Sequence, residues 1–245
     1  MSKAFPDARR LAMQLCCGLA AAFLLAACAT KDGAAPSMAS NAAPIVTDSD
    51  ETSGRKRARL RVELAIGYFQ QGQNTVALDE VKQALAADPS FADAYNLRGL
   101  IYMRLDDPGP AEDSFRRAIA LNPRDANVLH NYGWLLCQQS RYGDAQQQFS
   151  AALAVPSYAE RAKTLMTQGV CQLRAGQRPE AERSLMQAYE IDAGNPVIGL
   201  NLASLLAQRE EWQRAQFYIR RVNNSPAASA CLTSSSATVF WPCWK

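Results

Sequence analysis

The chain has 245 residues, of which 26 are Lys or Arg, 23 are Asp or Glu and one is His. This near balance of charge excludes a polyelectrolyte surface for nucleic acid. A single histidine leaves no Cys/His zinc set and no Ser/His pair with supporting context, and no Gly-rich phosphate loop or dinucleotide fingerprint occurs. We therefore expect no enzymatic activity, metal, cofactor or small-molecule substrate.

Residues 1–27 have the pattern of a secretory signal. Lys3, Arg9 and Arg10 form a basic start, and the apolar residues 11–26 that follow are too few to span a membrane. The end of this segment, Leu25-Ala26-Ala27-Cys28, resembles the lipobox of bacterial lipoproteins. That resemblance implies cleavage before Cys28 and acylation of this residue, which anchors the chain to a membrane. The alternative is a secreted protein with an unmodified Cys28.

The residue after Cys28 is Ala29. Similar lipoproteins are retained in the inner membrane by Asp at this place, so Ala29 implies the periplasmic face of a Gram-negative outer membrane. Residues 28–57 are rich in Ala, Ser, Thr and Pro and predict a flexible tether with a reach of roughly 30 Å. The basic residues that end it, from Arg55 to Arg61, are interpreted as a solvated helix face or as a contact with anionic lipid headgroups.

Residues 92–125 resemble one tetratricopeptide unit, a helix-turn-helix of 34 residues. Gly99 is small where two antiparallel helices would cross, Phe115 would fill the space beside the crossing, and Pro123 would end the second helix. The same frame recurs on both sides, with two extra residues near 155–158. The sequence therefore predicts an all-α, right-handed tetratricopeptide-repeat solenoid. Its five units are residues 58–91, 92–125, 126–161, 162–195 and 196–225.

Two cysteines, Cys137 and Cys171, lie 34 residues apart in the first helices of the third and fourth units. After export they would be in an oxidising compartment and could form a disulfide. The alternative is a pair of buried free thiols that act as small apolar residues. The sequence does not decide between the two.

In a solenoid of this kind the first helix of each unit lines the concave face, so a partner protein would bind in that groove. Positions five, nine, twelve and thirteen of each unit are expected to point into it. The fourth unit places Met166, Val170, Leu173 and Arg174 there. In the first three units, the groove residues that we expect to contact a partner are Val62, Ile66, Phe69, Asn96, Leu100, Met103, Arg104, His130 and Trp134.

The apolar members of this set favour a hydrophobic peptide or helix as the partner. A carboxylate clamp of the chaperone-binding repeat proteins would need Lys and Asn where this chain has Val62 and Ile66. The alternative is that these side chains are ordinary core between helices.

A lipobox, a short tether, tandem units and the string His130-Asn131-Tyr132-Gly133-Trp134-Leu135-Leu136-Cys137 together resemble the type IV pilus biogenesis and stability lipoproteins. These are pilotins of the pilus secretin. The resemblance implies a non-enzymatic outer-membrane lipoprotein that binds secretin subunits and promotes their localisation and multimerisation. A general periplasmic scaffold, for instance for peptidoglycan enzymes, remains the alternative.

The carboxyl-terminal residues 226–245 lack a helical period and are expected to be an irregular tail. The family usually carries a sixth unit in this place. A truncated or out-of-frame end and a loop closed by Cys231 and Cys243 are the two interpretations of this segment.

Overall fold

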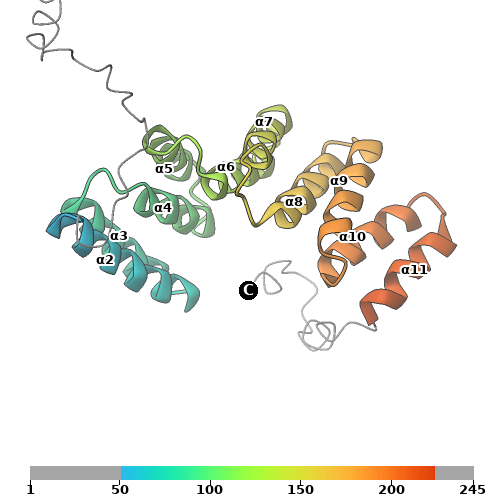
Figure 1. Cartoon of the computed structure of the whole chain (residues 1–245), viewed down its shortest axis with the longest axis horizontal. Coiled ribbons are helices and arrows are strands. Elements are labelled where there is room, and N and C mark those ends of the chain that lie inside the picture. The colour runs from blue at the N-terminus through green and yellow to red at the C-terminus, as the bar shows by residue number, and fades with distance from the viewer. Residues whose placement is uncertain (1–50, 224–245) are drawn as a thin grey trace, which may run out of the picture. The chain divides into compact units, whose positions relative to one another are not determined.

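The computed structural model describes residues 51–223, and all the regular elements in this part of the chain are α-helices. Their order is shown in Figure 1, from α2 in blue to α11 in red. Their bounds are α2 Ser53–Gln70, α3 Asn74–Ala87, α4 Ala92–Arg104, α5 Pro108–Leu121, α6 Ala126–Gln138, α7 Tyr142–Leu153, α8 Arg161–Arg174, α9 Arg178–Ile191, α10 Pro196–Ala207 and α11 Trp212–Asn223.

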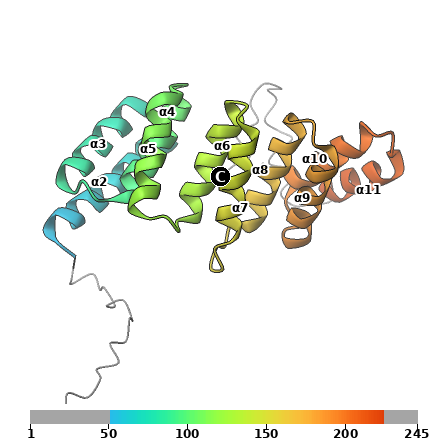
Figure 2. The same cartoon turned by 90° about the horizontal axis from the view of Figure 1, so that it is seen from above.

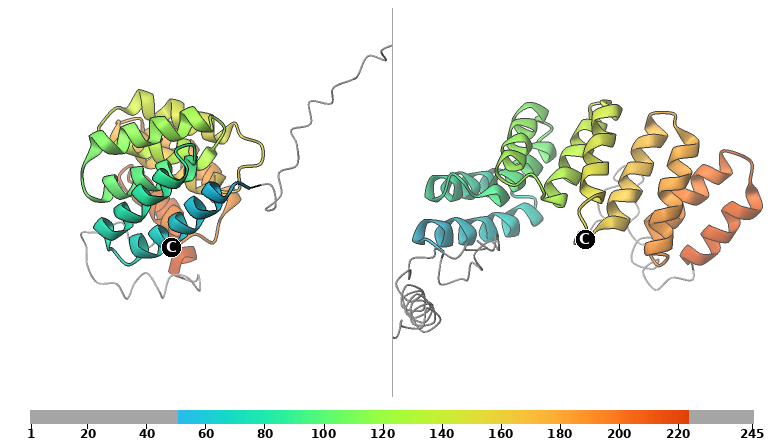
Figure 3. Two further views of the ribbon diagram at one scale, coloured as in Figure 1. Left: turned by 90° about the vertical axis from the view of Figure 1, so that its left-hand side faces the viewer. Right: turned by 45° about the horizontal axis from the view of Figure 1, so that its top comes forward.

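Consecutive helices form five antiparallel pairs, α2 with α3 through α10 with α11, and each pair packs on the next. Figure 2 and the right panel of Figure 3 show the pairs following one another in chain order. Each pair thus buries its apolar face on its neighbours. The predicted all-α tetratricopeptide-repeat fold is confirmed.

In the second, third and fourth pairs the helices approach closely because a glycine of the first helix faces a large side chain of the second. A Cβ atom built on Gly99 would lie 2.6 Å from Cε1 of Phe115, and one on Gly133 would lie 2.8 Å from the same atom of Phe149. Phe115 and Phe149 are completely buried. The role that the sequence predicts for Gly99 and Phe115 at the helix crossing is therefore confirmed.

The turn inside each pair contains one residue with a left-handed backbone. Gly72 and Gly176 have φ of 76°, and Asp106, Ser140 and Glu210 have φ of 57°, 61° and 61°. The five residues lie at the same position of successive units. A backbone of this shape reverses the chain within three or four residues, and glycine adopts it without steric cost.

Helix α2 begins at Ser53, so residues 53–57, which the sequence analysis assigns to the tether, are helical. The Thr52 side chain accepts a hydrogen bond from the Arg55 N–H at 3.1 Å and caps the helix. Arg55 also forms an ion pair with Asp88 and stacks over the Phe91 ring, which connects this first turn to the end of α3. These contacts are long-range, and composition alone does not reveal them.

Residues 154–160 connect α7 to α8 and hold the two extra residues of the third unit. Tyr158 from this link is buried against Ala126, Leu129 and Ala152. Towards the other end of these helices, Cys137 of α6 and Cys171 of α8 form a disulfide with a Cα–Cα distance of 5.8 Å. This bond joins the first helices of the third and fourth pairs.

Several features that the sequence predicts lie outside the described residues. They include the signal, the lipidation residue Cys28, most of the tether, and Cys231 and Cys243 of the tail. Within residues 51–223, no helix combines the length and hydropathy that crossing a membrane requires.

Candidate partner-binding face

The first helices of successive pairs contact one another, α2 with α4, α4 with α6 and α6 with α8. In Figure 1, α4, α6 and α8 lie below α5, α7 and α9, on one side of the stack. We call this side the inner face. Three interactions between neighbouring first helices mark its surface.

The first interaction joins α4 to α2. The guanidinium of Arg104 lies over the ring of Phe69, with its carbon 3.5 Å from the ring centroid, and donates a hydrogen bond to the Phe69 carbonyl oxygen. Burial lowers the pKa of Arg104 below its ordinary value. This arrangement holds the flat faces of the two side chains together and fixes where the Phe69 ring sits.

The second interaction joins α6 to α4. The side-chain amide of Asn131 donates a hydrogen bond of 3.0 Å to the Asn96 side-chain oxygen, and both residues are partly exposed. The repeat pattern predicts Asn96 at this face but does not assign Asn131 to it. A polar residue beside the predicted position is the only sequence signal for Asn131, and the pairing depends on how α6 packs on α4.

The third interaction joins α8 to α6. The Arg174 guanidinium carbon lies 4.9 Å from the centroid of the Trp134 ring. Leu100 and Met103 are partly exposed beside Trp134, and all three pack against the core that α4 to α7 share. Ile66 on α2 is 40% exposed. The inner face therefore presents apolar and aromatic side chains, with one amide pair a turn nearer the start of α4 and α6.

In three units, the residue at position five is predicted to lie at this surface but is buried. Val62 is 6% exposed, His130 2% and Met166 5%. The expectation that Val62 and His130 contact a partner is therefore wrong. Their side chains point into the contact with the following pair, which covers them. Asn96, the equivalent residue of the second unit, remains partly exposed, and Leu200 of the fifth unit is 48% exposed.

His130 is instead part of a buried hydrogen-bond cluster. Its Nδ1 lies 2.9 Å from the Thr164 hydroxyl, which is also 2.7 Å from the Tyr158 hydroxyl. Burial, and to a smaller extent the positive charge of Lys163, lowers the pKa of His130 to about 3. The imidazole is therefore neutral at physiological pH and serves packing between the third and fourth pairs.

The inner face presents side chains that suit contact with another polypeptide. Its exposed groups are Ile66, Leu100, Met103, Trp134 and the two asparagine amides. No group of three His, Cys, Asp or Glu side chains within residues 51–223 could hold a metal ion. A shallow hollow of about 930 Å³ opens elsewhere, over α9, where Glu182 is already paired with Arg209 and Arg214.

Comparison with known proteins gives the family. The tetratricopeptide-repeat family matches residues 62–126 and 132–196. The type IV pilus assembly protein PilF of Pseudomonas aeruginosa is 32% identical over 176 residues, which cover 71% of this chain and 68% of PilF.

Two solved structures agree with this match. The structure of Pseudomonas aeruginosa PilF has a TM-score of 0.67 at 27% identity, covering 71% of this chain and 78% of that one. The crystal structure of PilW, a widely conserved type IV pilus biogenesis factor, has a TM-score of 0.65 at 27% identity, covering 68% and 76%.

Proposed function

Because this chain belongs to the PilF and PilW family of tetratricopeptide-repeat proteins in type IV pilus biogenesis, we propose that it is the adaptor that binds secretin subunits and promotes their multimerisation. The observation that supports this most is the 32% identity to PilF over 176 residues. A scaffold protein of this kind needs a surface for another polypeptide and no catalytic group.

The inner face supplies such a surface. Ile66, Leu100 and Trp134 take apolar side chains of the partner, and Met103 adapts its shape to them. The amides of Asn96 and Asn131 lie one turn before Leu100 and Trp134 and can pair with the N–H and C=O groups of a bound main chain. We therefore propose an apolar segment of the secretin as the ligand.

The location of the protein is the second part of the proposal. Acylation of Cys28 anchors the chain to the periplasmic face of the outer membrane, and the tether leaves the repeats free to meet secretin subunits there. Loss of the lipid in a Cys28→Ala variant should leave the repeats folded and reduce secretin assembly.

Deleting the gene tests the proposed function directly. Unheated membrane extracts of the deletion strain should contain secretin monomer in place of the multimer. A deletion strain with unchanged multimer and several other partners in pull-down would support a general periplasmic scaffold instead.

The Ile66→Asp variant tests the inner face. An aspartate there puts a charge where an apolar side chain of the partner would be buried, so secretin binding should weaken tenfold or more, about 1.4 kcal/mol. Binding is measured with purified secretin segments, and circular dichroism checks that the helices remain. The matched control is Ile191→Asp on α9, because Ile191 is also exposed, at 54%. Equal binding by both variants would remove the inner face as the site.

A further inference from the structure

The outer side of α2 exposes two leucines in successive turns. Leu60 is 57% exposed and Leu64 50%. In the four later units, the residues equivalent to Leu60 are completely buried because the preceding pair covers them; they are Ala94, Val128, Thr164 and Ile198. Helix α2 begins the first pair, so none of the described pairs precedes it.

Two basic residues lie on the same side, one turn before the leucines. Of the five basic residues between 55 and 61, three are used inside the molecule. Arg55 pairs with Asp88, Arg59 with Glu51 and Arg61 with Glu80. Lys56 and Arg57 are exposed and form no ion pair with any residue in the described part of the chain.

Lys56 and Arg57 do not stabilise helix α2 through its dipole. The amino-terminal end of a helix carries partial positive charge and favours acidic side chains. The first turn of α2 has none. Lys56 and Arg57 are thus placed where they disfavour the helix slightly and where they flank exposed apolar residues.

We propose that this side of α2, formed by Lys56, Arg57, Leu60 and Leu64 and called here the outer stripe, lies against an anionic phospholipid surface. The two leucines enter the boundary between headgroups and acyl chains, while the two cations contact phosphates. Glu63 borders the stripe and remains in water.

The choice of a lipid surface rests on charge and on position in the chain. Leucines beside cations that pair with no carboxylate among residues 51–223 suit a surface that is negatively charged and apolar just below. The choice of a lipid surface also rests on the proposed function, because an anchor at Cys28 would hold α2 near the membrane through the residues between them.

The contact leaves the inner face free for a protein partner. Ile66 follows Leu64 by two residues, which places it roughly 160° around the helix. A chain that rests on its outer stripe therefore directs Ile66, Phe69 and their neighbours away from the lipid. Binding to the membrane and to the secretin would occur on different sides of α2.

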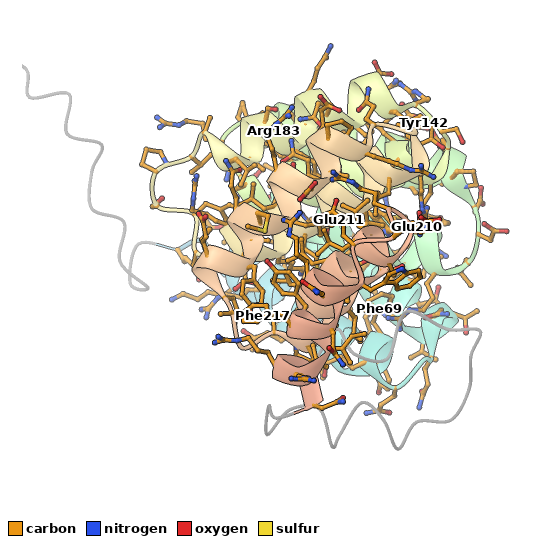
Figure 4. All side chains as sticks on the ribbon, turned by 90° about the vertical axis from the view of Figure 1, so that its right-hand side faces the viewer. Phe69, Tyr142, Arg183, Glu210, Glu211 and Phe217 are labelled. Atoms are coloured by element: carbon orange, nitrogen blue, oxygen red, sulfur yellow. A yellow bond between two sulfur atoms is a disulfide. The ribbon has the colours of Figure 1, made fainter. Side chains whose placement is uncertain are left out.

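Photo-crosslinking of the full mature chain tests the proposal. The variant Leu64→p-benzoylphenylalanine is placed in vesicles of phosphatidylethanolamine and phosphatidylglycerol, and lipid adducts are measured by mass spectrometry. The matched control carries the same group in place of Phe217 on α11. Phe217 is 51% exposed and also has a neighbouring cation, Arg221. Figure 4 shows Phe217 at the α11 end of the described chain.

We expect lipid adducts from position 64 and at least fivefold fewer from position 217. The Lys56→Glu/Arg57→Glu double variant should lower the yield at position 64 by fivefold or more, because each basic residue near an anionic surface changes partitioning roughly fivefold. Arg124→Glu/Arg220→Glu, with the same net charge, should not. Vesicles of phosphatidylcholine alone should give the low yield.

Equal adducts from both positions, or no effect of the Lys56 and Arg57 changes, would overturn the proposal. Adducts of position 64 with protein would assign the stripe to another part of this chain, a second copy or a protein partner. A full chain carrying Cys28→Ser separates helix from anchor, and it should keep the preference for position 64 at lower yield. Secretin multimers are counted separately, in membrane extracts of strains that carry the same variants. Failure of the proposed function would change the multimers and leave the lipid adducts unchanged.

Discussion

At the crossing of each helix pair, one residue of the first helix and one of the second are matched in size. Glycine faces Phe or Leu in the three middle units, whereas alanine stands at the equivalent place in the first unit, where the other residue is the smaller Val, and in the fifth, where it is a half-exposed Ile. The five combinations are Ala65 with Val81, Gly99 with Phe115, Gly133 with Phe149, Gly169 with Leu185, and Ala203 with Ile219.

This size match predicts the effect of Gly133→Ala. The new methyl group would lie 2.8 Å from the Phe149 ring, which is completely buried and cannot move away without disturbing the core. We expect a loss of roughly 1 to 3 kcal/mol in the free energy of unfolding, measured by urea denaturation.

The double variant Gly133→Ala/Phe149→Val reproduces the combination of the first unit. Phe149→Val alone leaves a cavity, and the alanine methyl group occupies part of it, so the double variant should lose less than the two single losses added together. Additive losses would contradict the size match.

His130 makes the stability of the protein depend on pH. The pKa of His130 is about 3 in the folded chain and 6.5 when exposed, so between these values the unfolded chain binds one proton more. The stabilisation from the neutral His130 imidazole is fully present above pH 6.5 and is lost as the pH falls towards 3. The free energy of unfolding should therefore drop by about 2 kcal/mol from this residue between pH 7 and pH 5.

A His130→Gln variant provides the comparison, because its amide can still bond the Thr164 hydroxyl but does not titrate in this range. Urea denaturation at several pH values should give a flatter dependence for the variant than for the natural chain. Parallel curves would show that His130 is accessible to protons in the folded state.

At the scale of the element, the turns between paired helices repeat one backbone shape with different residues. Gly72 and Gly176 adopt it freely, whereas Asp106, Ser140 and Glu210 adopt it at a cost of roughly 1 kcal/mol each. Glu210 gains little in return, since its side chain is exposed and the neighbouring Glu211 forms the ion pairs with Arg209 and Arg214.

Glu210→Gly should therefore stabilise the chain by up to about 1 kcal/mol, with helix content unchanged. Gly176→Ala, at the equivalent turn of the fourth pair, should destabilise it by about the same amount. Thermal unfolding followed by circular dichroism measures both. A lower midpoint for Glu210→Gly would contradict the interpretation of these turns.

At the scale of the whole molecule, stability comes from contacts between neighbouring pairs, and the ends of the stack differ from its middle. Leu200 and Ile219 of the last pair are 48% and 42% exposed. The residues equivalent to Ile219 in the earlier pairs are completely buried, and so are those equivalent to Leu60 in the later ones. Exposure at these positions reports which face of a pair lacks a neighbour among the described residues.

The sequence by itself determined the fold and the family of this protein. The 34-residue spacing of Gly99, Phe115 and their equivalents follows from packing inside one helix pair, and that packing depends on residues close together in the chain. The helix ends and turns follow from the same local signals, within a few residues. The choice of the first helices as the inner face also came from this frame.

Only the tertiary structure decided which side chains of that frame are accessible. Val62 and His130 stand at the expected positions of the repeat, but the following pair covers them. Asn131 belongs to the face because it pairs with Asn96 on another helix. The basic residues of α2 also differ in their ion pairing. Arg55 and Arg61 pair with Asp88 and Glu80, whereas Lys56 and Arg57 pair with no carboxylate among the described residues. Burial and charge pairing depend on residues distant in the chain, and a repeat pattern carries no information about them.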